Sequence, residues 1–315
     1  MKISVVMATY NGEAFLNEQL DSILKQTLMP DEILICDDCS SDNTWSILES
    51  YQIRYPELIH IYSNRKNIGY EKNFLNLIKK VSGDITFLSD QDDIWYPYKI
   101  ERMYQVFEQN ANILTLSAAY DLIDEEGEIF HDIRNIKFKN NKKLKKIDWK
   151  DFVIHPRYPG MSMAVRQPIV MQLSEIDLVK TPAHDWLLNL IAAMRDGMYL
   201  YDNVLTSYRQ HKYNSIGSSA NRNIASSKEM RISVMKNLLN TYESFLEIAE
   251  KQVYDMKKNE LAKCLIKVCK KRLKLFEEEK ITSLICWDIL NYRYLTMRSF
   301  FGDLYVGIKI KAEKR

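Results

Sequence analysis

Three carboxylates, Asp90, Asp92 and Asp93, fall within four residues of the sequence. They directly follow Ile85–Leu88, an apolar run after Gly83 that is typical of a buried strand. Acidic side chains at the end of a buried strand repel one another, and a cation between them relieves that repulsion. Hard oxygen ligands suit Mg²⁺ or Mn²⁺, above all where a substrate phosphate completes the coordination shell. An isolated acidic triplet can also be a solvated turn. The neighbouring sequence must therefore distinguish a metal site from such a turn.

Two further polar clusters, Thr9–Glu13 and Asp37–Ser40, also follow strand-like runs. Ligands of open α/β sheets bind at the carboxyl ends of the strands, so the three clusters are expected at one rim. There Tyr10 can stack on a base, Asp38 can accept a hydrogen bond from the base or ribose, and the acidic cluster can hold a metal on a diphosphate. The glycine-rich motifs of dinucleotide enzymes and P-loop proteins do not occur. The predicted donor-side residues of these loops are Thr9, Tyr10, Asn11, Glu13 and Asp38.

The elements that must position these clusters repeat along the first half of the chain. Apolar, β-branched runs start 26 to 29 residues apart, and segments with helical periodicity lie between them. This spacing is typical of βαβ units, so the sequence predicts an α/β fold with a largely parallel, doubly wound sheet. The expected strands are Ile3–Met7, Glu32–Cys36, Ile59–Tyr62, Ile85–Leu88 and Ile113–Ser117. The expected helices lie at about 13–26, after Asp42, and at about 70–81.

Composition sets the limits of the fold and of its partners. The 315 residues are 46% hydrophobic and carry a net charge of +2, so they can bury a full core, and nothing points to nucleic acid. Residues 220–315 hold 20 Lys and Arg against 12 Asp and Glu, are rich in Leu and Ile, and contain no proline. We therefore predict two parts: an α/β domain at 1–219 that carries the three polar clusters, and a helical region at 220–315 for membrane or acceptor association or for oligomerisation.

Several separate segments resemble family-2 glycosyltransferases, in the order that this family has them. They are Val5–Gly12, Ser22–Thr27, Glu32–Asp42, Asn67–Gly69, Asn73 and Gly83–Asp84. The acidic cluster stands where the family has its D-x-D metal motif, and the resemblance covers about residues 1–217. It implies a GT-A fold, a Rossmann-like and mostly parallel sheet, together with a nucleotide-sugar donor and Mg²⁺ or Mn²⁺.

The resemblance also implies roles for single residues. By matching positions, Asp38 contacts the base, Asp90 lies near the ribose and phosphates, and Asn73 belongs to the donor side. Asp92 is the preferred metal ligand, and Asp93 is the less certain one. The run Asp-Gln-Asp-Asp-Ile-Trp combined with Tyr-Arg-Gln-His is most similar to the bacterial rhamnosyltransferase-like branch. The favoured donor is therefore dTDP-rhamnose, with a UDP-sugar as the alternative.

Downstream, Asp185 stands where inverting members carry the catalytic carboxylate at the start of a helix. Displacing a nucleoside diphosphate from a sugar carbon needs a base on the opposite face, a role that Asp185 can fill; its alternative role is an ordinary helix N-cap. Arg209 can pair with phosphate oxygens, and His211 can ligate the metal or a phosphate.

The leading hypothesis is an inverting, metal-dependent glycosyltransferase of bacterial surface polysaccharide synthesis, acting on a glycan or lipid-linked acceptor. The alternatives are a non-catalytic nucleotide-sugar-binding or scaffold protein, or a metal-dependent nucleotidyltransferase. Five cysteines without an even framework, and no signal-like start, favour a cytoplasmic protein. The basic helical tail suggests peripheral contact with the inner face of the membrane, and packing on the catalytic domain or a homodimer are the alternatives.

Overall fold

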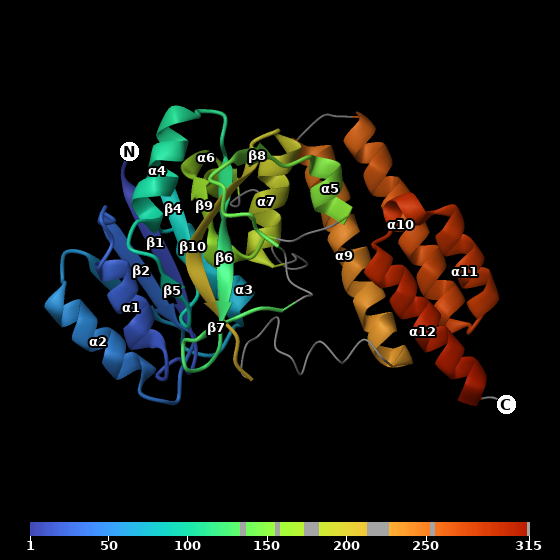
Figure 1. Cartoon of the computed structure of the whole chain (residues 1–315), viewed down its shortest axis with the longest axis horizontal. Helices are drawn as coiled ribbons and strands as arrows, with labels where there is room; N and C mark the ends of the chain where they lie inside the picture. The colour runs from blue at the N-terminus through green and yellow to red at the C-terminus, as the bar shows by residue number, and fades with distance from the viewer. Residues whose placement is uncertain (133–136, 155–157, 173–182, 213–226, 253–255, 314–315) are drawn as a thin grey trace. The chain divides into compact units, whose positions relative to one another are not determined.

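A computed structural model describes residues 1–132, 137–154, 158–172, 183–212, 227–252 and 256–313 (Figure 1). Contacts divide these residues into two compact units. The first comprises described residues of Met1–Trp149, Arg157–Leu178 and Ala183–Gln210, and the second those of Lys150–Pro156 and His211–Arg315.

The first unit is built on a ten-stranded sheet with the strand order β3-β2-β1-β4-β9-β6-β10-β5, to which β7 and β8 are attached through β6 and β10. β1 pairs in parallel with β2 and β4, and β2 with β3, whereas the short β9 is antiparallel to both of its neighbours. The strands are β1 (Ile3–Thr9), β2 (Glu32–Asp37), β3 (Ile59–Ser63), β4 (Ile85–Ser89), β5 (Ile94–Trp95), β6 (Thr115–Ile123), β7 (Ile129–Phe130), β8 (Leu144–Lys146), β9 (Met163–Arg166) and β10 (Met198–Arg209). The predicted α/β fold with a mostly parallel sheet is confirmed.

Helices cover both faces of this sheet, which explains why its strands are continuous apolar runs. Alternate β1 residues, Ile3, Val5 and Met7, share one core with α1, α2 and α4. α3 packs on β1 and β2, and α7 contacts α3, β6 and β10. The helices are α1 (Leu16–Leu24), α2 (Thr44–Arg54), α3 (Tyr70–Ile78), α4 (Lys99–Gln109), α6 (Gln167–Gln172) and α7 (His184–Met194), with a short 3-10 turn η1 (Gly160–Ser162).

The second unit is helical, as the composition predicted. It contains α5 (Trp149–Ile154) except for its first residue, and α9 (Lys228–Gln252), α10 (Met256–Glu277), α11 (Ile281–Leu290), η5 (Tyr292–Tyr294) and α12 (Met297–Glu313). Its apolar core joins Met235 of α9, Phe276 of α10, Leu284 of α11 and Val306 of α12. In the described part of the chain, every helix is too short or too polar to cross a lipid bilayer.

A buried charge network lies inside this helical unit and takes one residue from each of its four long helices. Arg231 of α9 donates from Nε to Asp303 of α12 over 2.7 Å, and Arg272 of α10 donates from Nε to Asp288 of α11 over 2.9 Å. Arg272 also pairs with Asp303, which ties the two bonds into one network. All four side chains are at most 5% exposed, so each charge depends on its partners for solvation.

Candidate active site

The parallel register brings the three predicted clusters to one edge of the sheet. Thr9 at the end of β1 is aligned with Asp37 of β2, and Met7 is aligned with Ser89 of β4. The loops that follow these strands therefore leave the sheet side by side, as expected for the carboxyl ends of parallel strands.

The loops after β1 and β2 are joined by side-chain hydrogen bonds. Thr9 Oγ1 donates to Asp37 over 3.0 Å, and the Ser41 amide donates to Asn11 Oδ1 over 2.9 Å. The Glu13 carboxylate accepts from both the amide and the side chain of Asn43, at 2.9 and 2.8 Å. Three of the predicted donor-side residues thus hold the two loops together.

Tyr10 differs from these three because its side chain is 48% exposed. Its main chain is fixed, since the Tyr10 amide donates to Gln91 Oε1 over 2.8 Å and its carbonyl accepts from Gln91 Nε2 over 3.1 Å. Gln91 lies between Asp90 and Asp92, so these bonds connect the Tyr10 loop to the acidic cluster. An exposed ring on a fixed backbone is suited to stacking on a nucleobase.

Asp38 and Asn73 are buried below this rim. The Asp38 carboxylate accepts from the amides of Ile68 and Gly69, with shortest distances of 3.0 and 2.8 Å, and from Asn64 Nδ2 over 2.8 Å. Asn73 donates to the Cys36 carbonyl over 2.8 Å. In this structure both side chains order the loop before α3, and their predicted contact with the donor stays a prediction.

The acidic cluster divides into two environments. Asp90 and Asp92 are half-buried, whereas Asp93 is fully buried. Burial, together with the negative charges of Asp92 and Asp185, raises the pKa of Asp90 to about 7. Asp93 accepts from the Arg209 amide over 3.0 Å, while its other oxygen has no hydrogen-bond partner among the described residues. Burial and its acidic neighbours raise the pKa of Asp93 well above its usual range.

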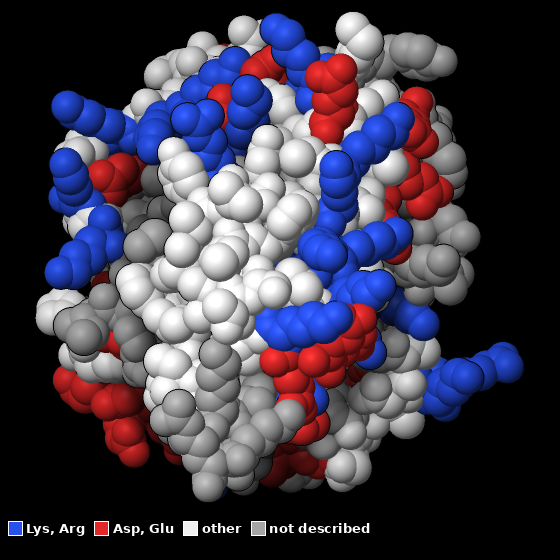
Figure 2. All heavy atoms as spheres, turned by 90° about the vertical axis from the view of Figure 1, so that its right-hand side faces the viewer, with Lys and Arg blue, Asp and Glu red and all other residues white. Residues whose placement is uncertain are grey.

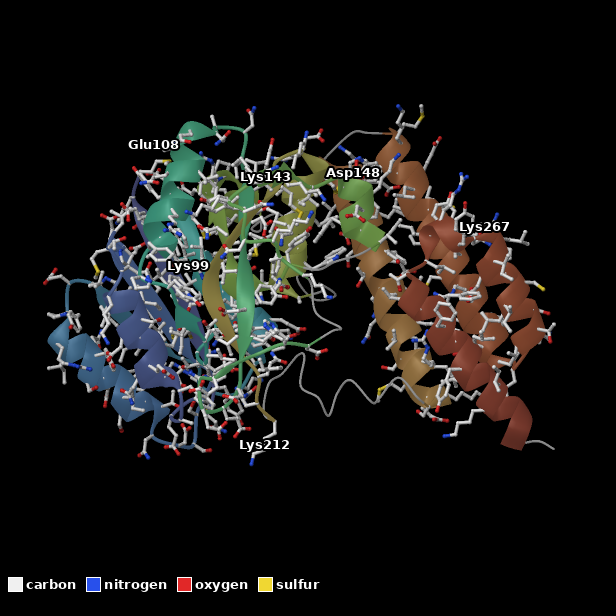
Figure 3. The ribbon with its side chains drawn as sticks, viewed as in Figure 1. Lys99, Glu108, Lys143, Asp148, Lys212 and Lys267 are labelled. Carbon is white, nitrogen blue, oxygen red and sulfur yellow. The ribbon has the colours of Figure 1, made fainter. Side chains whose placement is uncertain are left out.

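Lys99 is a buried cation beside this cluster that the sequence did not indicate. It is the first residue of α4 and lies in the interior (Figure 3). Its ammonium donates to the Met161 carbonyl over 2.7 Å and lies 3.7 Å from the centre of the Trp95 ring. Burial lowers its pKa well below the usual range, and the charges of Asp93 and Asp90 oppose that effect. From sequence alone, a lysine at the start of a helix is expected to be solvated.

Arg209 has a position different from the one expected of a phosphate ligand. Its side chain is 1% exposed, and its guanidinium donates to the carbonyls of Asp92, Asp124 and Glu125 over 2.8 to 3.1 Å. It also pairs with Glu18. The guanidinium is thus bonded to protein groups that hold the acidic loop, and its predicted role on phosphate stays a prediction.

Asp185 lies close enough to Asp90 for its charge to contribute to the raised pKa of that residue. It lies in the first turn of α7, whose N-cap position is occupied by Ala183. Its two oxygens accept from the amides of Gly160 and Trp186 over 3.0 and 2.7 Å. These two bonds fix the orientation of the carboxylate at the start of the helix.

His184, next to Asp185, is buried and stacks on Phe74 with 4.1 Å between ring centres. Burial lowers its pKa, and neither ring nitrogen has a hydrogen-bond partner among the described residues. A Cβ added at Gly160 would lie 3.0 Å from His184 Nε2 and 3.4 Å from Asp185 Cβ. Because Gly160 has no side chain, His184 and Asp185 can pack directly against its backbone.

His211 is the first residue of the last segment of the helical unit, so it is described apart from the cluster. Residues 213–217 of the same predicted motif lie outside the described residues. The proposed metal role of His211 stays a prediction.

Within the described ranges, no group of three or more His, Cys, Asp and Glu is arranged to hold a metal ion. Mg²⁺, however, is commonly bound by one or two carboxylates together with substrate phosphates. Asp90 and Asp92 offer such a pair, and the mutual repulsion seen in the pKa of Asp90 is what a cation relieves. The residues present therefore fit a divalent ion whose shell a diphosphate completes.

Relatives and solved structures identify the family. Residues 4–170 match the model of "Glycosyl transferase family 2". The chain is 33% identical over 227 residues to the dTDP-rhamnosyl transferase RfbG of Shigella flexneri, covering 68% of this chain and 74% of RfbG.

Two solved structures support the fold. Staphylococcus aureus TarS in complex with UDP has a TM-score of 0.57 at 16% identity, over 100% of this chain and 92% of that one. The mannosyltransferase PcManGT of Pyrobaculum calidifontis, with GDP-Man and Mn²⁺, has a TM-score of 0.54 at 13% identity, over 98% and 86%. The predicted GT-A fold with C-terminal helices is confirmed, and the chain belongs to glycosyltransferase family 2.

Proposed function

We propose that this glycosyltransferase is an inverting, metal-dependent enzyme that moves a sugar from a nucleoside diphosphate to a hydroxyl group of a glycan or lipid-linked glycan. One observation carries the proposal: Asp90 follows β4 at the carboxyl edge of the sheet, and both Asp92 and Asp185 lie close enough for their charges to raise its pKa. A fixed carboxylate beside an acidic pair supplies a base and a diphosphate-binding centre within a single site.

Asp185 is the proposed base. It accepts the proton of the acceptor hydroxyl while that oxygen bonds to the anomeric carbon, and the bond from this carbon to the diphosphate oxygen breaks on the opposite face. The amides of Gly160 and Trp186 hold the carboxylate in one orientation before and after proton transfer. This fixed geometry lowers the cost of positioning the base.

Asp92 and Asp90 are the proposed carboxylates for Mg²⁺ or Mn²⁺, with Asp93 and His211 as further candidates. When bound, the ion supplies positive charge for the departing diphosphate. The Mn²⁺ in the PcManGT structure is consistent with such an ion on this fold. On the donor side, Tyr10 stacks on the base, while Thr9, Asn11, Glu13, Asp38 and Asn73 shape the pocket around it. Arg209 supports the acidic loop.

dTDP-rhamnose is the proposed donor, because RfbG is a dTDP-rhamnosyl transferase and is 33% identical to this chain over 227 residues. A UDP-sugar is the alternative, since TarS has been solved with UDP and with UDP-GlcNAc. We further propose that the enzyme acts in bacterial surface polysaccharide synthesis, on the cytoplasmic side of the membrane.

The test compares Asp185→Asn with Asp196→Asn. Asp196 follows the same helix at its other end, is exposed, and has φ 60°, a conformation that asparagine tolerates. Transfer is measured with a panel of nucleotide-sugars and Mn²⁺, and donor binding is measured by thermal shift. Asp185→Asn should lower the turnover rate by about 10²- to 10⁴-fold and keep donor binding, whereas Asp196→Asn should match the wild type.

Full turnover in Asp185→Asn would exclude Asp185 as the base. EDTA should abolish transfer and added Mn²⁺ should restore it, and transfer that persists in EDTA would contradict the metal requirement. Stabilisation by UDP-sugars alone would replace dTDP-rhamnose as the donor.

A further inference from the structure

The helical unit exposes large apolar side chains on its last elements. α12 carries Phe301, Tyr305 and Ile308, which are 55 to 62% exposed and are spaced four and three residues apart along one face of the helix. Three more exposed apolar side chains precede them on α11 and η5, namely Ile289, Leu290 and Tyr292. Figure 2, which faces the side formed by these helices, shows an uncharged area with Lys and Arg on both sides.

The outer stripe of α12 is not needed for the core of the unit. The opposite side of this helix carries Asp303, which closes the charge network, and Val306, which joins the apolar core. Gly307 packs against Ile281, because a Cβ there would lie 2.4 Å from Ile281 Cγ2. A helix that buries one face normally exposes polar residues on the other, so a second apolar stripe indicates a partner.

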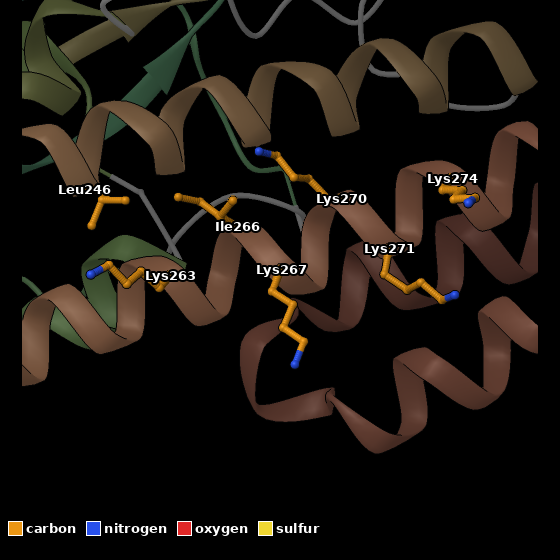
Figure 4. Close-up of a pocket in the computed structure, with 7 residues that line it drawn as sticks. All are labelled: Leu246, Lys263, Ile266, Lys267, Lys270, Lys271 and Lys274. Carbon is orange, nitrogen blue, oxygen red and sulfur yellow. The ribbon is translucent and has the colours of Figure 1, made fainter.

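Lysines on α10 lie next to this apolar surface. They line a groove of about 590 Å³ together with Leu246 and Ile266 (Figure 4). Lys263 and Lys270 point to α9, where they pair with Glu250 and Glu243. Lys267 and Lys271 leave α10 on the side away from α9 (Figure 4).

Contacts between elements place Lys267 and Lys271 beside η5 and α11. A hydrogen bond to the Cys264 thiol raises the pKa of Tyr294 in η5. Trp287 of α11 donates to the Val268 carbonyl over 3.4 Å. Residues three and seven positions after Cys264 share its face of α10, so these two lysines border the apolar surface. Arg293 of η5, also exposed, adds a third positive charge.

We propose that the surface formed by α11, η5 and the outer face of α12 binds an anionic lipid bilayer, with Lys267 and Lys271 on the phosphate headgroups. Exposed Phe, Ile and Leu enter the headgroup boundary, and the tyrosines, with an apolar ring and a polar hydroxyl, suit that depth. A symmetric dimer through the same surface would place these positive charges near their own copies, whereas an anionic surface neutralises them.

The test is co-sedimentation of the full-length protein with vesicles of phosphatidylcholine, with and without phosphatidylglycerol. Lys267→Glu with Lys271→Glu should weaken binding to the anionic vesicles by at least about 25-fold, since each lysine near such a surface contributes about fivefold. Phe301→Ser with Tyr305→Ser should weaken binding by about tenfold or more. The controls are Ile53→Ser and Lys79→Glu, which change equally exposed residues of the catalytic unit and should leave binding unchanged.

Wild-type protein that ignores anionic vesicles, or stripe and lysine variants that bind as the wild type does, would overturn the inference. A wild-type dimer that the stripe variants convert to monomer, with unchanged vesicle binding, would assign the surface to a second copy instead. Membrane binding would bring the enzyme to the proposed lipid-linked acceptor, so the biological role of this surface rests on the proposed function, whereas the binding itself does not. Vesicle binding is measured without sugar transfer. Failure to bind vesicles would therefore leave the proposed activity standing, and failure to transfer sugar would leave the membrane inference standing.

Discussion

Each unit of this protein buries a group of charged side chains, and the two groups are built on opposite principles. In the helical unit, two arginines meet two aspartates in closed ion pairs. In the catalytic unit, Asp90 and Asp93 lie near Lys99, and burial together with the charges of neighbouring aspartates raises the pKa of both. The balanced group pairs each aspartate with an arginine and joins four helices. In the acidic group the carboxylates outnumber Lys99, so their charged forms are disfavoured until a cation relieves the repulsion.

The largest expected effect separates activity from stability in the acidic group. Asp92→Asn should lower sugar transfer by roughly 10³-fold, because the diphosphate loses a principal partner of its metal ion. Its melting temperature should stay level or rise, since one repelling charge near Asp90 is gone. Transfer assays and thermal unfolding check both statements, with Asp196→Asn as control. A clear fall in melting temperature would show that Asp92 stabilises the fold.

The balanced group should behave in the opposite way. Arg272→Met leaves Asp288 buried without its cation and breaks the link to Asp303, which should cost about 3 to 5 kcal/mol. Hydrogen exchange of peptides from α9 to α12 measures the loss where it occurs. Lys263→Met on the same helix breaks an exposed pair with Glu250 and should change stability by less than about 1 kcal/mol. Equal exchange in the two variants would contradict the role given to the network.

Lys99 links the two cases, because it is a buried lysine beside the carboxylates of Asp90 and Asp93. Lys99→Met removes the donor to the Met161 carbonyl and should cost about 2 kcal/mol. Mn²⁺ should raise the melting temperature of this variant more than that of the wild type, since the ion then replaces a missing charge. Lys25→Met, at an exposed lysine, is the control. Identical Mn²⁺ shifts would refute this coupling.

The last expected effect concerns pH. Burial raises the pKa of Asp288 to about 6 in the folded unit, while Arg272 opposes that effect. An unfolded aspartate titrates near its ordinary value of about 4, so this carboxyl favours folding most below that pH. Its favourable contribution is lost as the pH rises from about 4 to about 6. Asp288→Asn does not titrate, so the wild type should gain stability relative to this variant as the pH falls from about 6 to about 4. Urea unfolding over that range measures the difference, and parallel curves would contradict the shifted pKa.

The parallel half of the fold could be predicted from the sequence because its strands are apolar on both faces and recur at a regular spacing. The expected strands over Ile3–Met7, Glu32–Cys36 and Ile85–Leu88 coincide with β1, β2 and β4, with ends differing by one or two residues. β9 and β10 were not predicted. β9 has only four residues, and the apolar pattern of β10 is broken at Asp202 and Asn203.

The candidate site was predictable where residue type alone suggests chemistry. Asp90 and Asp185 lie far apart in the sequence, yet the charge of Asp185 contributes to the raised pKa of Asp90, and their shared role in one site stays a prediction. The buried cations were less accessible to such reasoning. Lysine and arginine are usually solvated, and the burial of Lys99 and Arg209 follows from long-range packing around Met161 and Glu18 that no local pattern encodes.

The bonds between the first two loops have a consequence for how this enzyme could change its donor. Asn11 is tied to Ser41 and Glu13 to Asn43, so a substitution in one loop alters the shape of the other. Redesign of base preference by single replacements should therefore give poorly ordered rims. Replacing both members of a bonded pair, positions 11 and 41 or positions 13 and 43, should change the donor side while keeping the two loops connected.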